Sequence, residues 1–294
     1  MQIADLTVAI STFERPDGLT RCLDAVLGGK VLPAEVIIID QSENDLTRSL
    51  IESRQTGPVS IVYVHQERRG LSASRNAAIN RAKRPVLAFT DDDCVPDGGW
   101  VAAIERTFAA PFPPDAATGR VLPVGPDEPA TYSVSPRDSV ARADFTGRLI
   151  PWLVGTGGNF AVKREWLDRV GTYDERLGVG SPGKAAEDAD LFYRLLRAGA
   201  CVRYEPDALV YHERQSKSRR IASRWSYGYG IGAFCGIWLR KGDLYATRIL
   251  GYWLFSLCRE LIGVVVRWEW MEAYQRLLSL QGTARGLIYG LGVS

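Results

Sequence analysis

The chain has 294 residues, 46% of them hydrophobic and 24% charged, which is enough to bury the core of one large domain or of one domain with an appendage. Lys and Arg number 36 against 34 Asp and Glu, so the formal charge of +2 gives no global sign of a nucleic-acid-binding protein. The five cysteines are odd in number and include no CxxC pair, which argues against a disulfide framework and against a zinc site.

The opening residues MQIADLTVAIST contain no basic segment followed by a long apolar one. A secretory signal has that pattern, so none is expected here. Together with the cysteine usage, this predicts a cytoplasmic location.

Strands and helices alternate through the first part of the chain. Strands are predicted at 6–11, 35–40, 59–65 and 85–89, with helices between them at 15–29, 43–54 and 70–82. This alternation predicts an α/β fold with a mostly parallel sheet flanked by helices. Ligands of such sheets bind beyond the carboxyl ends of the strands. The segments that follow the strands, STFER, DQSEND, QERRG and TDDD, are therefore expected along one edge.

The middle of the chain is harder to interpret. A helix is expected to about Phe108, but the Pro-rich and loop-rich region from 110 to 151 gives only weak helix and strand signals. Beyond it, GTGGN leads through a short strand into a helix, and a second helix is predicted from Glu187 to Gly199. Two further strands are expected in CVRYEP and ALVYH.

From about residue 215 the composition becomes basic, then Gly-rich and aromatic, then strongly apolar at 244–266. An Arg at the centre of a membrane span costs roughly 2.5 to 3.5 kcal/mol, so Arg248, Arg259 and Glu260 disfavour a simple span. Lys241, Arg248 and Arg259 are instead expected on one stripe of an apolar helix, which is typical of a helix at a membrane interface. Packing on the first domain or on another subunit is the alternative. We predict two domains, 1–214 and a helical extension at 215–294.

The acids Asp91, Asp92 and Asp93 directly follow a predicted buried strand. Adjacent like charges cost free energy unless a cation or donors offset them. Mg²⁺ and Mn²⁺ take carboxylate oxygens, and in an extended segment Asp91 and Asp93 would point to the same side. A lone DxD also occurs by chance in loops, but its place after a strand favours a metal site. His212, at the end of a predicted strand, is a competent further ligand for Mn²⁺.

Glu187 and Asp188 open a predicted helix. Acids are common in a first turn because they complement the helix dipole, but a carboxylate there can also act as a general base toward a hydroxyl nucleophile. The glycines just upstream would let a bulky ligand approach the backbone. We therefore predict that Gly157, Gly158 and Asn159 lie on the acceptor side of a site.

Six segments in this order resemble family 2 glycosyltransferases of the GT-A fold, over residues 5–214. They are VAISTFERPDGLTRCLDAVL, VIIIDQSEND, GLSASRNAAIN, VLAFTDDDCVPDGGWV, GTGGNFAVKREWLDRVGTYDE and EDADLFYRLLRAGACVRYEPDALVYHER. The resemblance implies a Rossmann-like GT-A sheet. It also implies an inverting transfer from a nucleotide diphosphate sugar to a hydroxyl acceptor, with Mg²⁺ or Mn²⁺ as cofactor.

The resemblance further implies roles for single residues. Asp188 would be the catalytic base, supported by Glu187. Asp93 would bind the metal, with His212 as a further ligand, although the adjacent acids leave open which of them bind it directly. Donor binding would involve Ser11, Phe13 with its ring against the base, Asp40 as an acceptor from the base, Arg75 near the base or diphosphate, Asp91 on the ribose side, and Asp92.

The leading functional prediction is a hexosyl transfer to a lipid-linked or cell-envelope glycan, at the inner face of the cell membrane. A sugar nucleotidyltransferase is one alternative, although STFERPDG is a poor version of the Gly-rich loop that such enzymes carry. A non-catalytic sugar-nucleotide-binding scaffold at the membrane is another, against which Asp93, Asp188 and His212 together argue. No nucleic-acid partner is expected. Donor, acceptor, linkage and oligomeric state stay open, and an oligomer is compatible with the sequence.

Overall fold

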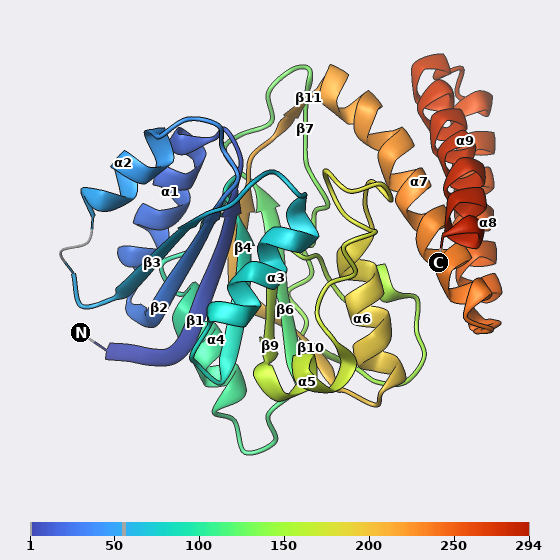
Figure 1. The fold of residues 1–294 in the computed structure, drawn as a ribbon. Helices are drawn as coiled ribbons and strands as arrows, with labels where there is room; N and C mark the ends of the chain where they lie inside the picture. Colours follow the sequence, from blue (N-terminus) through green and yellow to red (C-terminus); the bar gives the residue numbers. More distant parts are fainter. Residues whose placement is uncertain (1, 55–56, 294) are drawn as a thin grey trace.

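The computed structural model of the chain describes residues 2–54 and 57–293. Within them, one nine-stranded sheet has the order β3-β2-β1-β4-β9-β6-β10-β5, with β8 also paired to β10 (Figure 1). The strands are β1 (Gln2–Thr12), β2 (Val31–Asp40), β3 (Ser60–His65), β4 (Val86–Asp91), β5 (Cys94–Pro96), β6 (Ala116–Pro123), β8 (Ala143–Phe145), β9 (Asn159–Lys163) and β10 (Val202–His212). A separate two-stranded sheet joins β7 (Thr131–Tyr132) to β11 (Gln215–Ser216).

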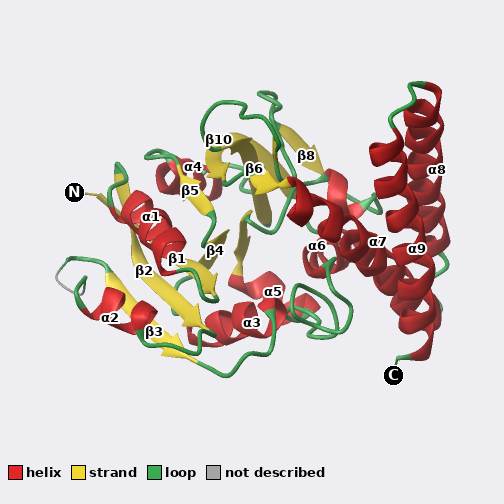
Figure 2. Cartoon of the chain, turned by 90° about the horizontal axis from the view of Figure 1, so that it is seen from above, coloured by secondary structure: helices red, strands yellow, loops and turns green. Residues whose placement is uncertain are grey.

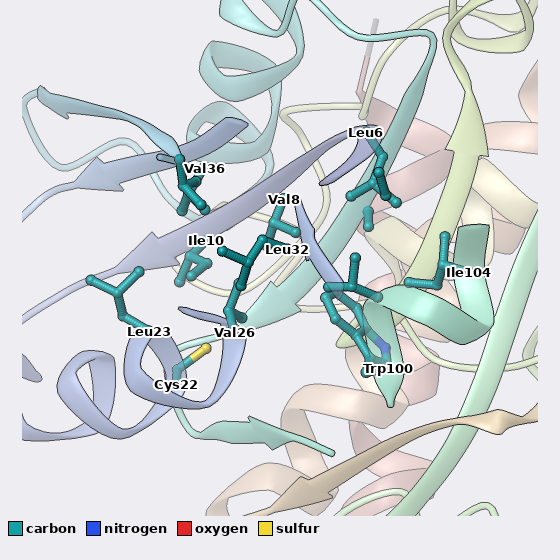
Figure 3. Packing of buried hydrophobic residues seen from close by; sticks show 14 of the residues in the cluster. Leu6, Val8, Ile10, Cys22, Leu23, Val26, Leu32, Val36, Trp100 and Ile104 are labelled. Carbon is teal, nitrogen blue, oxygen red and sulfur yellow. The ribbon is translucent and has the colours of Figure 1, made fainter. Parts of the chain in front are cut away.

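Helices cover both faces of the sheet (Figure 2). They are α1 (Pro16–Leu27), α2 (Leu46–Glu52), α3 (Leu71–Arg81), α4 (Trp100–Phe108), α5 (Arg164–Val170) and α6 (Glu187–Arg197), with a 3-10 turn at Pro151–Leu153. In β2, alternate residues enter two different cores because successive side chains of a strand point to opposite faces. Val36 and Ile38 belong to a core cluster that includes residues of α1 and α4 (Figure 3), whereas Ile37 and Ile39 belong to a second cluster that includes residues of α3, α5 and α6. Burial on both faces explains the unbroken apolar run.

The strands β3, β2, β1 and β4 are parallel, which confirms the predicted alternation. Their register aligns the carboxyl ends, since Thr12 pairs with Asp40, and Ser11 pairs with Asp91. The segments that follow these strands therefore meet at one edge of the sheet, as predicted. Antiparallel pairing enters beyond β4, where β9 joins β4 to β6.

Two sequence predictions need correction here. The segments CVRYEP and ALVYH form one strand, β10, whose register against β6 shifts between Glu205 and Leu209. Pro206 has no N–H to donate to the neighbouring strand, and it lies where the regular pairing is interrupted. The strand β6 lies in the region of weak signals, yet it pairs with β9 and β10 inside the sheet. Only glycine fits at position 119 of this strand, because a Cβ there would lie 2.0 Å from the carbonyl oxygen of Ala208.

The C-terminal extension forms three helices beside the sheet, α7 (Lys217–Arg240), α8 (Tyr245–Val266) and α9 (Trp270–Gly292) (Figure 2). Glycines recur every fourth residue along the contact of α7 with α9: Gly228, Gly232 and Gly236 on α7, and Gly282, Gly286 and Gly290 on α9. A Cβ at Gly286 would lie 1.9 Å from the carbonyl oxygen of Tyr229. Only glycine allows two helix backbones to approach this closely.

The extension also packs on the first domain. Phe234 and Trp238 of α7 contact Tyr193 of α6, with ring centroids 5.6 and 4.9 Å apart. Among the described helices, α8 has the length and composition of a membrane span, and only 17% of its most apolar stretch is buried. The predicted basic stripe is only partly right. Lys241 follows α7 rather than joining α8, because the chain turns at Gly242 with φ of 79°.

Candidate active site

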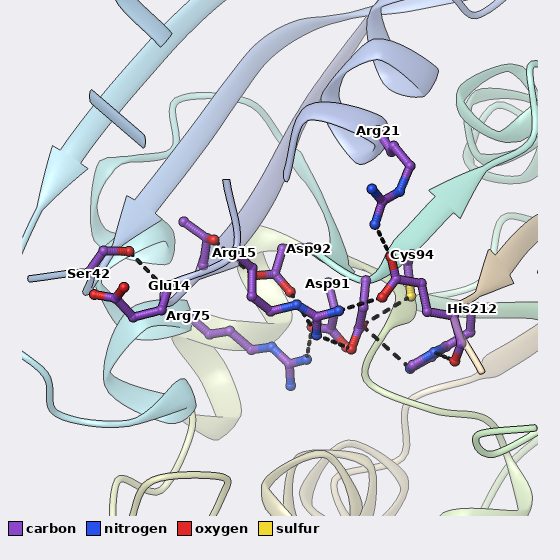
Figure 4. Close-up of polar contacts among 12 residues, drawn as sticks. Glu14, Arg15, Arg21, Ser42, Arg75, Asp91, Asp92, Cys94 and His212 are labelled. Carbon is purple, nitrogen blue, oxygen red and sulfur yellow. Dashed lines mark hydrogen bonds and ion pairs between the residues drawn. The ribbon is translucent and has the colours of Figure 1, made fainter. Parts of the chain in front are cut away.

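Three adjacent acids lie where β4 ends at the predicted edge of the sheet (Figure 4). Asp91 is the last residue of β4, and Asp92 and Asp93 form a turn rather than the extended segment that we predicted. The turn lets the three carboxylates take three different partners. Asp91 accepts a hydrogen bond from Arg75 at 2.8 Å, Asp92 from the Thr12 hydroxyl at 2.8 Å, and Asp93 from Arg15 at 2.7 Å.

Arg15 is the cation that the acid cluster needs. Its guanidinium donates to Asp93 and, at 2.5 Å, to Glu213, and it lies 3.6 Å from Asp92. Burial and then the charge of Asp93 raise the pKa of Asp92 to about 7, although Arg15 and the Thr12 hydroxyl oppose the shift. Sequence analysis gave Arg15 no role. Its position directly after β1, in STFER, was the available signal.

Asp93 and His212 form the part of the site that suits a metal ion. The Nδ1 of His212 lies 2.9 Å from the carbonyl oxygen of Glu213, and because a carbonyl only accepts, Nδ1 is the donor of this hydrogen bond. The other ring nitrogen, Nε2, lies 3.5 Å from Asp93 Oδ1, so these two atoms are close enough to hold one metal ion between them. Imidazole and carboxylate are both suitable ligands for Mn²⁺.

The thiol of Cys94 belongs to the same cluster, since its sulfur and the ligand atoms of Asp93 and His212 all lie within 4.8 Å of one another. Burial and then the charge of Asp91 raise the pKa of Cys94 well above its ordinary value. A protonated thiol is a poor metal ligand. The residues that fit a hard cation here are therefore Asp93 and His212.

Arg75 joins the two halves of the site. Its side chain is 4% exposed and donates to Asp91 at 2.8 Å and to Glu187 at 3.2 Å. Burial and then the charge of Asp188 raise the pKa of Glu187, against the effect of Arg75. We predicted that Arg75 would lie near the base or diphosphate of a donor. In the structure its guanidinium forms ion pairs with Asp91 and Glu187, so it holds the end of β4 and the start of α6 together.

Asp188 lies in the first turn of α6, as predicted, and its carboxylate is fixed by two backbone amides. Its Oδ2 accepts from the N–H of Gly157 at 2.9 Å and its Oδ1 from the N–H of Ala189 at 2.7 Å. The residue before the helix, Ala186, has φ of 70°, a left-handed conformation that is uncommon outside glycine. Such strained positions cluster at functional sites.

The glycines of the Gly-rich turn make room for side chains of the site itself, and not only for a ligand as we predicted. A Cβ at Gly157 would lie 2.8 Å from Arg75 Nη1, and one at Gly158 would lie 2.7 Å from Asp91 Oδ2. Asn159 is 2% exposed, and its amide accepts from the Trp100 indole and donates to the carbonyls of Arg120 and Ala208. Asn159 therefore holds strands together, and its predicted place on the acceptor side needs correction.

The residues predicted for the nucleotide end lie together but differ in access. Ser11 is half-buried beside Asp91 in the sheet, and the guanidinium of Arg68 lies 4.1 Å from the Phe13 ring centroid. Asp40 is fully buried, and its carboxylate already accepts from the Tyr63 hydroxyl at 2.8 Å and the Ser42 N–H at 2.9 Å. In this structure Asp40 thus shapes the edge of the site rather than facing solvent.

Tyr227, on α7, was missed by sequence analysis. Burial and then the charges of Asp188, Glu187 and Asp93 raise its pKa to about 12. One turn later on the same helix, Gly230 touches the backbone of Ala185, since a Cβ there would lie 2.7 Å away. The extension therefore packs against the segment that leads into α6. The pattern SYGYGIG gave no signal for this, because only tertiary packing brings it there.

The mostly parallel sheet with its flanking helices is that of the GT-A class of glycosyltransferase folds. The mannosyltransferase PcManGT from Pyrobaculum calidifontis, solved with GDP-Man and Mn²⁺, shares this fold with a TM-score of 0.62 at 15% sequence identity. The match covers 98% of this chain and 87% of that one. GalNAc-T7, solved with UDP, GalNAc and Mn²⁺, shares the fold with a TM-score of 0.55 at 18% sequence identity. That match covers 78% of this chain and 50% of the GalNAc-T7 chain.

The chain belongs to glycosyl transferase family 2, whose sequence pattern it matches over residues 7–171. A pre-mycofactocin glycosyltransferase of Mycobacterium tuberculosis is 26% identical over 249 residues, which are 84% of this chain and 50% of that protein. A glucosyl-dolichyl phosphate glucuronosyltransferase of Haloferax volcanii is 26% identical over 230 residues, 71% of this chain and 69% of that protein. This chain thus spans about half the length of the first relative.

Proposed function

We propose that the chain is a metal-dependent inverting glycosyltransferase that moves a hexosyl group from a nucleoside diphosphate sugar to a hydroxyl acceptor. The observation that carries the proposal is the presence in one site of two carboxylates with different surroundings. Asp93 lies 3.5 Å from Nε2 of His212, whereas Asp188 is fixed by backbone amides at the start of a helix. Membership of glycosyl transferase family 2 supports this over the nucleotidyltransferase and scaffold alternatives.

The proposed chemistry needs one base. Asp188 would accept the proton of the acceptor hydroxyl while that oxygen bonds to the anomeric carbon and the bond from this carbon to the diphosphate breaks. Attack opposite to the leaving group inverts the configuration, and no second carboxylate nucleophile is required. Glu187, fixed by Arg75, would support the orientation of Asp188. Tyr227 would line the acceptor side through α7.

Mg²⁺ or Mn²⁺ held by Asp93 and His212 would supply positive charge that neutralises the leaving diphosphate. Arg15 already bonds Asp93, so it would add a second cation on the same side of the site. Asp92 would keep its hydrogen bond from Thr12 and shape the turn. Solved structures of the same fold contain Mn²⁺ with a nucleotide or nucleotide sugar, which supports this choice of cofactor.

The test is a thermal-shift panel of nucleoside diphosphates and their sugars, with and without Mn²⁺. We expect one nucleotide class to stabilise the protein only with metal, by about 2.7 kcal/mol when the ligand is at 100 times its Kd. Asp93→Asn should abolish this gain. Asp5→Asn, at the other end of β1 and exposed, removes the same charge and should keep it. If a nucleotide stabilised the protein equally with and without metal, and equally in the parent and in Asp93→Asn, the proposed site would be contradicted.

We further propose that α8 lies on the inner face of a membrane and that the acceptor is lipid-linked or part of a cell-envelope glycan. The exposed residues of α8 support this. Tyr252, Phe255, Ile262, Val265 and Val266 are between 40% and 71% exposed, and the exposed Arg248 and Arg259 lie on the same helix. A large exposed apolar patch with cations beside it is typical of a helix at an anionic membrane surface.

A further inference from the structure

A pocket of about 390 Å³ lies at the end of α6 that is opposite to the proposed base. Its walls come from the segment before the 3-10 turn, from α5 and from the last turn of α6, and four of its six lining residues are arginines: Arg148, Arg169, Arg194 and Arg197, with Val170 and Ala198 between them. Asp188 and Arg197 are separated by about 14 Å along the helix axis, at about 1.5 Å per residue. The pocket is therefore distinct from the active site.

Positive charge exceeds negative charge in this pocket. Two buried carboxylates hold three of the arginines, since Asp190 binds Arg194 at 2.8 Å, and Asp243 binds Arg197 at 3.1 Å and Arg148 at 3.6 Å. Within residues 2–54 and 57–293, no carboxylate pairs with Arg169, whose guanidinium lies 4.7 Å from the Trp166 ring centroid. Four guanidinium groups thus face two carboxylates.

The arginines also have donors to spare. Arg194 uses its Nε for Asp190 and its Nη1 for the carbonyls of Val170 and Gly171, whereas its buried Nη2 has no hydrogen-bond partner in the part of the chain that the structure describes. A buried donor without a partner costs free energy that a bound acceptor would recover. Arg197 and Arg148 lie 3.1 and 3.6 Å from Asp243, so two guanidinium groups share this one carboxylate.

A second arginine pocket in the same protein shows the contrast. It measures about 60 Å³, and its arginines are Arg106, Arg142 and Arg203. Each has a carboxylate of its own, because Arg106 pairs with Asp207, Arg142 with Glu205 and Arg203 with Asp144. That pocket is neutral and small, so arginine content alone does not make an anion site.

We propose that the pocket formed by Arg148, Arg169, Arg194 and Arg197 binds a phosphate group. Guanidinium groups match the oxygen geometry of phosphate with paired N–H donors, and several of them converge here on one cavity. The phosphate can belong to a soluble phosphate ester or to an anionic lipid headgroup. The second source is close to α8, since the Arg148 guanidinium lies 5.6 Å from the ring centroid of Tyr245, the first residue of that helix.

The test compares two double variants of equal charge change in the full chain. Arg148→Gln with Arg169→Gln removes one arginine that touches a buried carboxylate and one outer arginine of the proposed site. Arg142→Gln with Arg106→Gln does the same in the neutral pocket. Inorganic phosphate is titrated by calorimetry without divalent metal, and cosedimentation is measured with phosphatidylglycerol-containing and pure phosphatidylcholine vesicles.

We expect the first variant to bind phosphate about tenfold more weakly than the parent, and the neutral-pocket variant to match the parent. If the first variant also loses about tenfold in binding to anionic vesicles, the phosphate is that of a lipid. If only the phosphate titration changes, the ligand is soluble. Equal phosphate binding by the parent and both variants, or equal loss in both variants, would overturn the proposal. Neither readout depends on sugar transfer, so failure here leaves the proposed active site untouched.

Discussion

The carboxylate of Asp188 is held in one orientation, as a general base must be. Two backbone amides fix its carboxylate, one on each oxygen, so Asp188→Asn removes the proton acceptor and one of these two hydrogen bonds, while the donor side at the end of β4 should stay intact. We expect transfer to fall by about 10² to 10⁴, the usual contribution of a general base. Steady-state transfer and donor-induced thermal shift should be measured on the same sample. Transfer equal to that of the parent would refute the assignment of the base.

Asp92 should make the metal-free protein less stable as pH rises. Its pKa of about 7 in the folded protein exceeds the ordinary value of 3.8, so its contribution is fully present below pH 3.8 and is lost as pH rises through 7. Between pH 5 and pH 8, we expect the free energy of unfolding of the parent to fall by on the order of 2 kcal/mol more than that of Asp92→Asn.

Urea unfolding with a chelator at both pH values measures this difference. Asp5→Asn, an exposed acid outside the cluster, serves as the control and should keep the pH dependence of the parent. Identical pH dependence in the parent and Asp92→Asn would show that Asp92 is ionised throughout this range.

Residue-level prediction succeeded where local sequence determines position. The first turn of a helix and the end of a strand are readable from periodicity, which placed Asp188 in the first turn of α6 and His212 at the end of β10. It did not foresee partners from distant segments. Arg75 and Asn159 have buried partners far away in sequence that use their donors and acceptors, and the predicted role of Arg75 toward a donor stays a prediction. The remaining assigned roles stay predictions.

At the scale of elements, the α7 and α9 contact depends on glycine. Gly286→Ala would place a Cβ 1.9 Å from the carbonyl oxygen of Tyr229, so the helices must separate, and we expect the protein to lose about 2 kcal/mol of stability. Gly251→Ala on α8 meets nothing within 4 Å and should instead gain about 0.5 to 1 kcal/mol from helix propensity. Thermal unfolding followed by circular dichroism should thus shift in opposite directions. Shifts of the same sign would argue against close packing.

Elements were predictable in proportion to their own sequence signals. The strand β2, with its run of isoleucines, and the amphipathic α1 were visible at once. The strand β6, AATGRVLP, has few β-branched residues and was not. It is stabilised by its neighbours β9 and β10, and pairing between segments far apart in the chain is not visible in a short window of sequence.

At the scale of the whole molecule, α8 gives the protein one apolar side. Phe255→Asp should weaken binding to phosphatidylglycerol-containing vesicles at least about tenfold, because a charge would replace an exposed ring that enters the lipid on binding. Phe112→Asp is the control, since Phe112 is 86% exposed against 68% for Phe255 but belongs to the loop between α4 and β6. Flotation with vesicles measures both.

Vesicle binding that is unchanged by Phe255→Asp would contradict the membrane proposal. Loss of self-association in that variant, with no vesicle binding by the parent, would assign the exposed side of α8 to a second copy of the chain. Sequence reading identified the apolar helix but not its setting, because its position beside α7 and α9 depends on glycine contacts across the bundle.

The Arg75 side chain constrains how this protein can be recombined with its relatives. Its guanidinium links a carboxylate at the end of β4 to one at the start of α6, segments separated by about a third of the chain. A chimera that exchanges only the part before β5 imports its own residues at positions 75 and 91 but keeps Glu187 of this chain. An imported segment without the arginine would leave Glu187 buried without its counterion, so exchanges are better made in surface loops than across this ion pair.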